Sequence, residues 1–116
     1  MTLRTLFVTL LTGFLLVVPG ASTAHAKQCD EPAYPVPNGS FTNLTAKKTT
    51  CGKAARVAVK HYECRTKTGP TGHCVSKVKG FGCSEDRTTA PTGDFYAKVT
   101  CTKDKAKVAF SYSQTP

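Results

Sequence analysis

Two histidines and two cysteines lie close enough in the sequence to supply the four ligands of a zinc ion. His61-x-x-Cys64 is followed by His73-Cys74, and two imidazoles with two thiolates form a tetrahedral zinc site. The competing interpretation is a Cys64–Cys74 disulfide beside two partly exposed histidines. Extracellular cysteines are oxidised, and a disulfide does not bind zinc. We favour the disulfide, expect no metal or other cofactor, and keep a zinc-binding module as an alternative.

Hydrolytic catalysis requires a nucleophile and a base within hydrogen-bonding reach of each other. His61 and His73 are the two histidines after residue 26, and neither lies in a Gly-x-Ser-x-Gly or His-Glu-x-x-His motif. We expect Glu85 and Asp86 in a solvated loop, where adjacent carboxylates rarely converge on one substrate atom. Oxidised cysteines are not available as nucleophiles. We therefore expect that the protein is not an enzyme, and we assign no catalytic residue.

The basic side chains are the main indication of a binding partner. The chain has a net charge of +9. Such a surface attracts anionic polymers, for example cell-wall phosphates, acidic polysaccharide or extracellular nucleic acid. The competing interpretation is that the lysines keep a small domain soluble and its sheet edges unpaired. The candidate anion-binding residues are Lys53, Arg56, Lys60, Lys98, Lys103, Lys105 and Lys107.

A secreted toxin or protease inhibitor is a further alternative, because disulfide frameworks present rigid loops to partner proteins. Residues 66–71 lie between Cys64 and Cys74, and they offer Lys67 to a trypsin-like pocket. Gly69 and Pro70 are equally typical of an ordinary connection between a helix and a strand. We favour the ordinary connection.

The first 26 residues predict export from the cell. Arg4 precedes an apolar run at residues 6–18, and Ala24-His25-Ala26 fits the small-x-small pattern before a signal-peptide cleavage site. The run is shorter than the roughly 17 to 25 residues that span a bilayer, and no later segment approaches that length. We expect a secreted, extracellular protein that begins at Lys27 and has no membrane span.

All six cysteines follow the predicted signal peptide, and their even number predicts a disulfide framework. The 90 residues after residue 26 make a small core without tryptophan, and three disulfides would add about 3 kcal/mol each. Six cysteines allow 15 pairings. A helix of this length would place Cys51 and Cys64 roughly 20 Å apart, too far for a bond. Among the remaining pairings we favour Cys29 with Cys51, Cys64 with Cys74, and Cys83 with Cys101.

One helix is predicted at residues 51–63, ending near Cys64. Thr49 and Thr50 precede it and can cap its first turn. Gly69, Pro70 and Gly72 follow it and favour a loop. An apolar stripe recurs at helical spacing, and charged residues lie off that stripe. The stripe consists of Cys51, Ala55, Ala58 and Tyr62, and the charged residues are Lys53, Arg56, Lys60 and Glu63.

Four strands are predicted around this helix. Residues 40–47 are rich in threonine, and residues 75–83 are interrupted by Gly80 and Gly82. Residues 95–101 and 106–113 alternate between apolar and polar side chains and are joined by a short turn, which is typical of an antiparallel hairpin. The inward sets are Phe95, Ala97, Val99 and Cys101 in one strand, and Ala106, Val108, Phe110 and Tyr112 in the other.

The cysteine pattern resembles a group of small exported bacterial domains. These combine an N-terminal cysteine, a Thr/Ser-Cys-x-x-Ala-Arg helix, a Gly-Phe/Tyr-x-Cys strand and a Val-x-Cys strand. The resemblance implies the fold and the export, and it implies no activity. It rests on Cys51, Ala54, Ala55, Arg56, Val57, Gly80, Phe81, Cys83, Val99 and Cys101.

These observations predict a signal peptide at residues 1–26, an extended proline-rich arm at 27–39 and one domain at 40–116. The predicted fold class is α+β, with one helix packed on a three- to four-stranded antiparallel sheet and stapled by disulfides. We expect a monomeric, non-catalytic binding or structural module at the cell surface or in the medium. Its expected partner is an anionic cell-wall or extracellular polymer.

Overall fold

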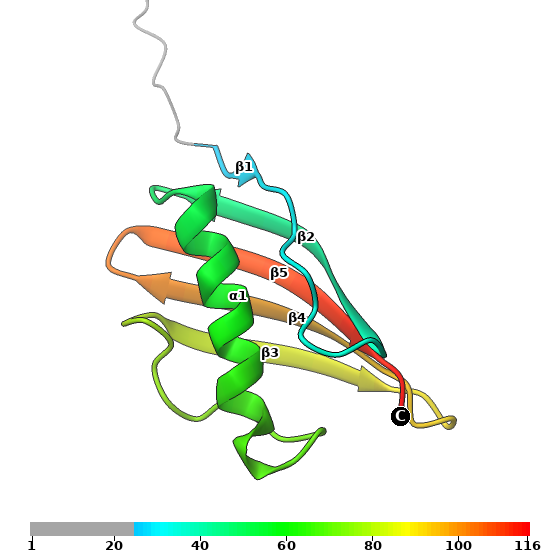
Figure 1. The fold of residues 1–116 in the computed structure, drawn as a ribbon. Helices are drawn as coiled ribbons and strands as arrows, with labels where there is room; N and C mark the ends of the chain where they lie inside the picture. Colours follow the sequence, from blue (N-terminus) through cyan, green and yellow to red (C-terminus); the bar gives the residue numbers. More distant parts are fainter. Residues whose placement is uncertain (1–24) are drawn as a thin grey trace, which may run out of the picture.

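A single helix lies across one face of a five-stranded antiparallel sheet in the computed structural model, which describes residues 25–116 (Figure 1). The predicted signal peptide lies almost entirely outside these residues. The elements are β1 (Lys27–Gln28), β2 (Gly39–Lys47), α1 (Cys51–Arg65), η1 (Thr66–Thr68), β3 (Gly82–Thr89), β4 (Phe95–Lys103) and β5 (Ala106–Gln114).

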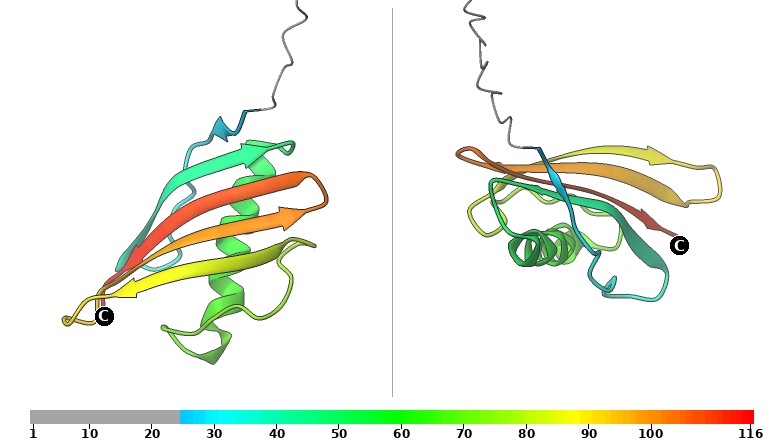
Figure 2. Two further views of the ribbon diagram at one scale, coloured as in Figure 1. Left: turned by 180° about the vertical axis from the view of Figure 1, so that it is seen from behind. Right: turned by 90° about the horizontal axis from the view of Figure 1, so that it is seen from above.

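The strands are arranged in the order β1-β2-β5-β4-β3. Viewed from above, the sheet forms one layer, and α1 lies on one side of it (Figure 2). The α+β class is therefore confirmed, but the sheet has five strands rather than three or four. The fifth strand is β1, because Lys27 and Gln28 of the arm pair with Ala46 and Thr45 at the edge of the sheet.

The hairpin formed by β4 and β5 carries most of the sheet's contribution to the core. Val99 lies opposite Phe110, and Ala97 lies opposite Tyr112, on the face that α1 covers. All four of these side chains are buried. The alternation predicted for both strands is confirmed, because every second residue turns into the core.

Strand β2 matches the predicted segment and contains one irregularity. Its pairing with β5 shifts between Thr42 and Thr45, and Asn43 has a φ of 54°. Asparagine tolerates this left-handed conformation better than most residues. The resulting bulge keeps both Phe41 and Leu44 in the core, although they are three residues apart.

The strand predicted at residues 75–83 is wrong in its position. Val78 and Phe81 exchange two backbone hydrogen bonds of 2.8 Å, and Lys79 and Gly80 between them both have positive φ angles. This tight turn reverses the chain, so strand β3 begins only at Gly82 and runs on to Thr89. Glu85 and Asp86 consequently belong to an edge strand and not to the predicted loop.

Helix α1 begins as predicted and buries a different stripe of its surface. The hydroxyl of Thr50 accepts a hydrogen bond of 3.1 Å from the backbone N–H of Lys53, which caps the first turn. The buried residues are Ala54, Val57, Ala58, His61 and Arg65. Of the predicted stripe, Ala58 is fully buried, and Cys51, Ala55 and Tyr62 are partly buried and pack against the core. The fully buried face differs from the predicted one because it includes two polar residues, His61 and Arg65.

The structure contains three disulfides, and the favoured pairing is confirmed. Cys29–Cys51 joins the N-terminal arm to the start of α1, and Cys64–Cys74 joins the end of α1 to the loop that follows. Cys83–Cys101 joins directly opposed residues of β3 and β4. Each end of the helix and the edge strand β3 are thereby held by a covalent bond.

Candidate functional site

Four lysines surround a hollow at the N-terminal end of α1, which we call the lysine pocket. Its volume is about 540 Å³. Lys48 lies in the turn between β2 and α1, and Lys53 lies in the first turn of α1. Lys103 ends β4, and Lys105 lies in the turn between β4 and β5. The remaining lining residues are Thr49, Thr50, Phe81, Asp104 and Ala106.

Two tight turns bring these lysines together. Lys48 has a φ of 53° and reverses the chain between β2 and α1, while Asp104 has a φ of 52° in the turn between β4 and β5. Lys103 extends over Gly80, where an added Cβ would lie 3.1 Å from its Nζ atom. Gly80 has a φ of 82°, and this conformation favours glycine at the position.

The electrostatics of the lysine pocket favour an anion. The start of a helix carries the positive end of the helix dipole, and the first turn of α1 contains no acidic side chain. Asp104 is the one carboxylate among the described residues that line the pocket. Four ammonium groups against one carboxylate give the pocket an excess of positive charge.

The seven predicted anion-binding residues fall into three groups. Lys53, Lys103 and Lys105 meet in the lysine pocket, where they are joined by Lys48, which is not among the seven predicted residues. Arg56 and Lys60 line a separate hollow further along α1. Lys98 and Lys107 alternate with the inward-facing residues of β4 and β5, so they lie on the sheet face that α1 does not cover.

At the other end of the helix, Arg65 is almost completely buried, with an exposed fraction of 1%. Its guanidinium donates hydrogen bonds to the Tyr34 hydroxyl at 2.6 Å, to Gln114 Oε1 at 2.7 Å and to the Pro70 carbonyl at 2.9 Å. Tyr34 also donates to Gln114 Oε1 at 2.9 Å. Burial raises the pKa of Tyr34, and the neighbouring Arg65 opposes that shift. These contacts join the arm, the helix, the 69–72 loop and the end of β5.

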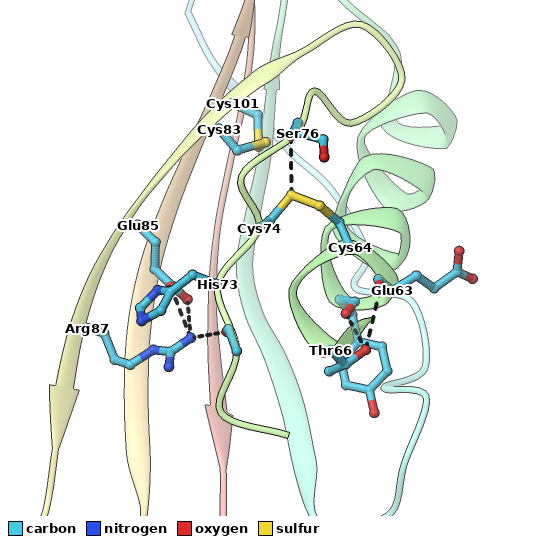
Figure 3. Close-up of a disulfide and its surroundings, with 12 residues drawn as sticks. Glu63, Cys64, Thr66, His73, Cys74, Ser76, Cys83, Glu85, Arg87 and Cys101 are labelled. Carbon is cyan, nitrogen blue, oxygen red and sulfur yellow. Dashed lines mark hydrogen bonds and ion pairs between the residues drawn. A yellow bond between two sulfur atoms is a disulfide. The ribbon is translucent and has the colours of Figure 1, made fainter. Parts of the chain in front are cut away.

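Strand β3 contributes a second polar cluster beside the Cys64–Cys74 disulfide (Figure 3). Arg87 Nη2 lies 3.0 Å from Glu85 Oε2 and donates to the Tyr112 hydroxyl at 2.9 Å, and that hydroxyl also contacts Glu85. Arg87 donates further to the carbonyls of Thr71 and Gly72. His73 Nδ1 lies 3.1 Å from Glu85 Oε2. These hydrogen bonds hold the loop that follows α1 against the sheet.

The two histidines occupy different environments, so the expectation of two partly exposed histidines is wrong for His61. His61 has an exposed fraction of 2% and packs against the rings of Phe110 and Tyr112. Its Nδ1 atom has no hydrogen-bond partner among the described residues. Burial, assisted by Arg65 and Arg87, lowers the pKa of His61 to about 4, so its ring is neutral at pH 7.

The structure also bears on two other predicted features, the zinc alternative and the loop at residues 66–71. The zinc alternative loses two of its four ligands, because Cys64 and Cys74 are bonded to each other. Lys67 lies in the short helix η1. The carbonyl of Pro70 accepts a hydrogen bond from Arg65, and those of Thr71 and Gly72 accept hydrogen bonds from Arg87. The loop considered for a protease pocket is therefore helical at Lys67, and the residues that follow Lys67 are held in place by hydrogen bonds.

No protein-family model, curated protein or solved structure matches this chain. Within residues 25–116, no helix is both long and apolar enough to cross a membrane. The assignment of a function therefore rests on the geometry and charge of the surface.

Proposed function

We propose that this protein is an exported, non-catalytic module that binds an anionic polymer through the lysine pocket. The observation that carries the proposal is the convergence of Lys48, Lys53, Lys103 and Lys105 at the positive end of α1. These residues come from two distant segments, so their convergence is a property of the folded protein. Charge spread evenly for solubility does not require such a convergence.

The size and openness of the lysine pocket favour a polymer over a single small anion. A volume of about 540 Å³ exceeds the space of one phosphate or sulfate group several times over, and small-molecule sites bury most of their ligand. An open basin with four ammonium groups instead suits several negative groups of one chain. The multiple contacts release counterions, which makes such binding strong at low salt and weak at high salt.

Export to the extracellular space is part of the same proposal. Three disulfides are typical of secreted proteins, and the pattern of residues 1–26 is that of a signal peptide. Outside the cell, the anionic polymers available to such a module are cell-wall phosphates, acidic polysaccharides and nucleic acids. We expect the lysine pocket to bind each of these polymers more tightly than a neutral chain. Its affinities for the different anionic polymers should differ less from one another.

Heparin chromatography of the oxidised protein tests the proposal with a matched pair of variants. Lys53→Gln/Lys103→Gln removes two charges from the lysine pocket, and Lys98→Gln/Lys107→Gln removes two charges from the opposite sheet face. We expect the first variant to elute at a clearly lower salt concentration than the second. The second variant should elute close to the salt concentration expected from its net charge alone. Equal elution of the two variants would show that only overall charge matters, and would refute the lysine pocket as the site.

A further inference from the structure

The outer face of α1 carries a second hollow that differs from the lysine pocket in its chemistry. Pro32 of the arm and Ala55 and Val59 of the helix form its apolar floor, and its volume is about 300 Å³. Arg56, Lys60 and Lys79 form its rim. We call it the apolar groove.

The apolar groove continues into a smaller hollow toward the C-terminal end of α1. Lys60 and Lys79 line both hollows, and the second also contains Lys67, Lys77 and Glu63. Glu63 is paired with Lys60 at 2.8 Å. Arg56, Lys67, Lys77 and Lys79 form no ion pair within the described part of the chain. The surface around the apolar floor is therefore strongly positive along the outer side of the helix.

We propose that the apolar groove binds an acidic peptide segment of a partner protein that inserts one large apolar side chain. A volume of about 300 Å³ accommodates one aromatic or branched side chain with space to spare. The ring of cations then complements carboxylates on both sides of that side chain. A hydrophobic groove that accepts the apolar anchor side chains of a bound peptide is a recurring mode of peptide recognition.

The shape of the surface favours a peptide over a membrane. Proteins that lie on a bilayer push apolar side chains outward into the acyl region, whereas Ala55 and Val59 lie at the bottom of a recess and are only partly exposed. A recess receives an inserted group. A sugar polymer would satisfy the cations and leave the apolar floor without a partner.

Fluorescence anisotropy with labelled seven-residue peptides tests this proposal on the oxidised protein. The main probe has phenylalanine at its centre and three acidic residues on each side, and the comparison probe replaces that phenylalanine with alanine. We expect the phenylalanine probe to bind at least ten times more tightly. Equal binding of the two probes would show attraction by charge alone and would overturn the proposal. Preferential binding of anionic lipid vesicles over the phenylalanine probe would also overturn it, in favour of a membrane surface.

Three variants locate the binding site. Val59→Glu should weaken binding of the phenylalanine probe at least tenfold, because the substitution places a carboxylate on the apolar floor. Arg56→Gln/Lys79→Gln changes only exposed side chains, so it tests the rim without threatening the fold, and we expect a loss of fivefold or more. Lys53→Gln/Lys103→Gln of the lysine pocket should change the affinity less than Arg56→Gln/Lys79→Gln does. If the lysine-pocket variant has the larger effect, the peptide binds elsewhere and the proposal fails, whatever the heparin result.

Discussion

The guanidinium carbon of Arg65 lies 4.4 Å from the centre of the Tyr112 ring, in the interior of the domain. Arg65 takes part in none of the ion pairs between described residues. Its charge is balanced instead by the faces of aromatic rings and by three oxygen acceptors. A buried cation is tolerated only when such partners replace the water that it loses.

Replacing Arg65 should therefore destabilise the domain strongly. We expect Arg65→Met to lower the free energy of unfolding by at least about 2 kcal/mol, because the variant loses charge-assisted hydrogen bonds and ring contacts. Arg65→Lys should be nearly as unstable, since a single ammonium cannot reproduce the forked geometry. Guanidinium chloride unfolding measures both values.

The exposed arginine on the same helix provides the control for that experiment. Arg56→Met should change the free energy of unfolding by less than about 0.5 kcal/mol, as surface substitutions usually do. If Arg65→Met were as mild as Arg56→Met, the buried network would not hold the arm and the loop to the sheet.

Acidification should destabilise the protein through His61. The folded state lowers the pKa of His61 from 6.5 to about 4, so below pH 6.5 the unfolded chain binds a proton that the folded protein excludes. The free energy of unfolding therefore falls as the pH drops from about 6.5 to about 4, by on the order of 3 kcal/mol. Denaturant unfolding at several pH values across this interval measures the slope.

The variant His61→Leu separates this effect from that of the carboxylates, which are the same in both proteins. Its free energy of unfolding should depend less on pH between 6.5 and 4 than that of the original chain. Identical slopes for the two proteins would mean that His61 is not the group that responds.

Reduction of the three disulfides should unfold the domain. The sequence separations of the bonds are 22, 10 and 18 residues, and loop-closure entropy gives about 3 kcal/mol for each. Their sum is comparable with the whole stability of an ordinary domain, about 5 to 15 kcal/mol. Circular dichroism before and after dithiothreitol monitors the loss of structure, and an unchanged spectrum after complete reduction would contradict the prediction.

The proposed export predicts a specific N-terminus for the secreted protein. Mass spectrometry of the protein recovered from the medium should give a chain that begins at Lys27 and contains no free thiol. Recovery of the chain with residues 1–26 still attached, or with reduced cysteines, would argue against a secreted protein.

The central strands, the helix and the disulfide pairing could be predicted from local signals. Strands β4 and β5 alternate in polarity, and Thr50 caps the helix before Cys51. The fully buried stripe of the helix differs from the predicted one because His61 and Arg65 face the core. Distant partners such as Tyr34 and Gln114 make the burial of Arg65 tolerable. Polar residues on a buried face are not distinguishable from a solvent-facing stripe without those partners.

The position of strand β3 is hidden in the sequence for a related reason. Glu85 and Arg87 alternate with Ser84, Asp86 and Thr88, and charged residues at inward positions obscure the pattern of a half-buried strand. Inward charges on an edge strand also discourage pairing with another chain. Cys83, Glu85 and Arg87 recur at every second position, and this spacing is the sequence signal that places them on one face of a strand.

The lysine pocket could be predicted only in part. Lys103 and Lys105 are close in sequence, but the sequence does not indicate that their turn lies beside the start of α1. That neighbourhood follows from the position of the helix over β5 and β2. Lys98 and Lys107 were grouped with them by proximity in the sequence, and the alternation of the strands places them on the other face.

The most direct test of the lysine pocket is a two-dimensional NMR titration of the oxidised protein with long-chain inorganic polyphosphate. We predict that the largest backbone amide shifts occur at Lys48, Thr50, Lys53 and Lys103, and that Lys98 and Ser111 on the uncovered sheet face shift little. Shifts of similar size on both faces, or none at low salt, would contradict the account of an anion-binding site at the start of α1.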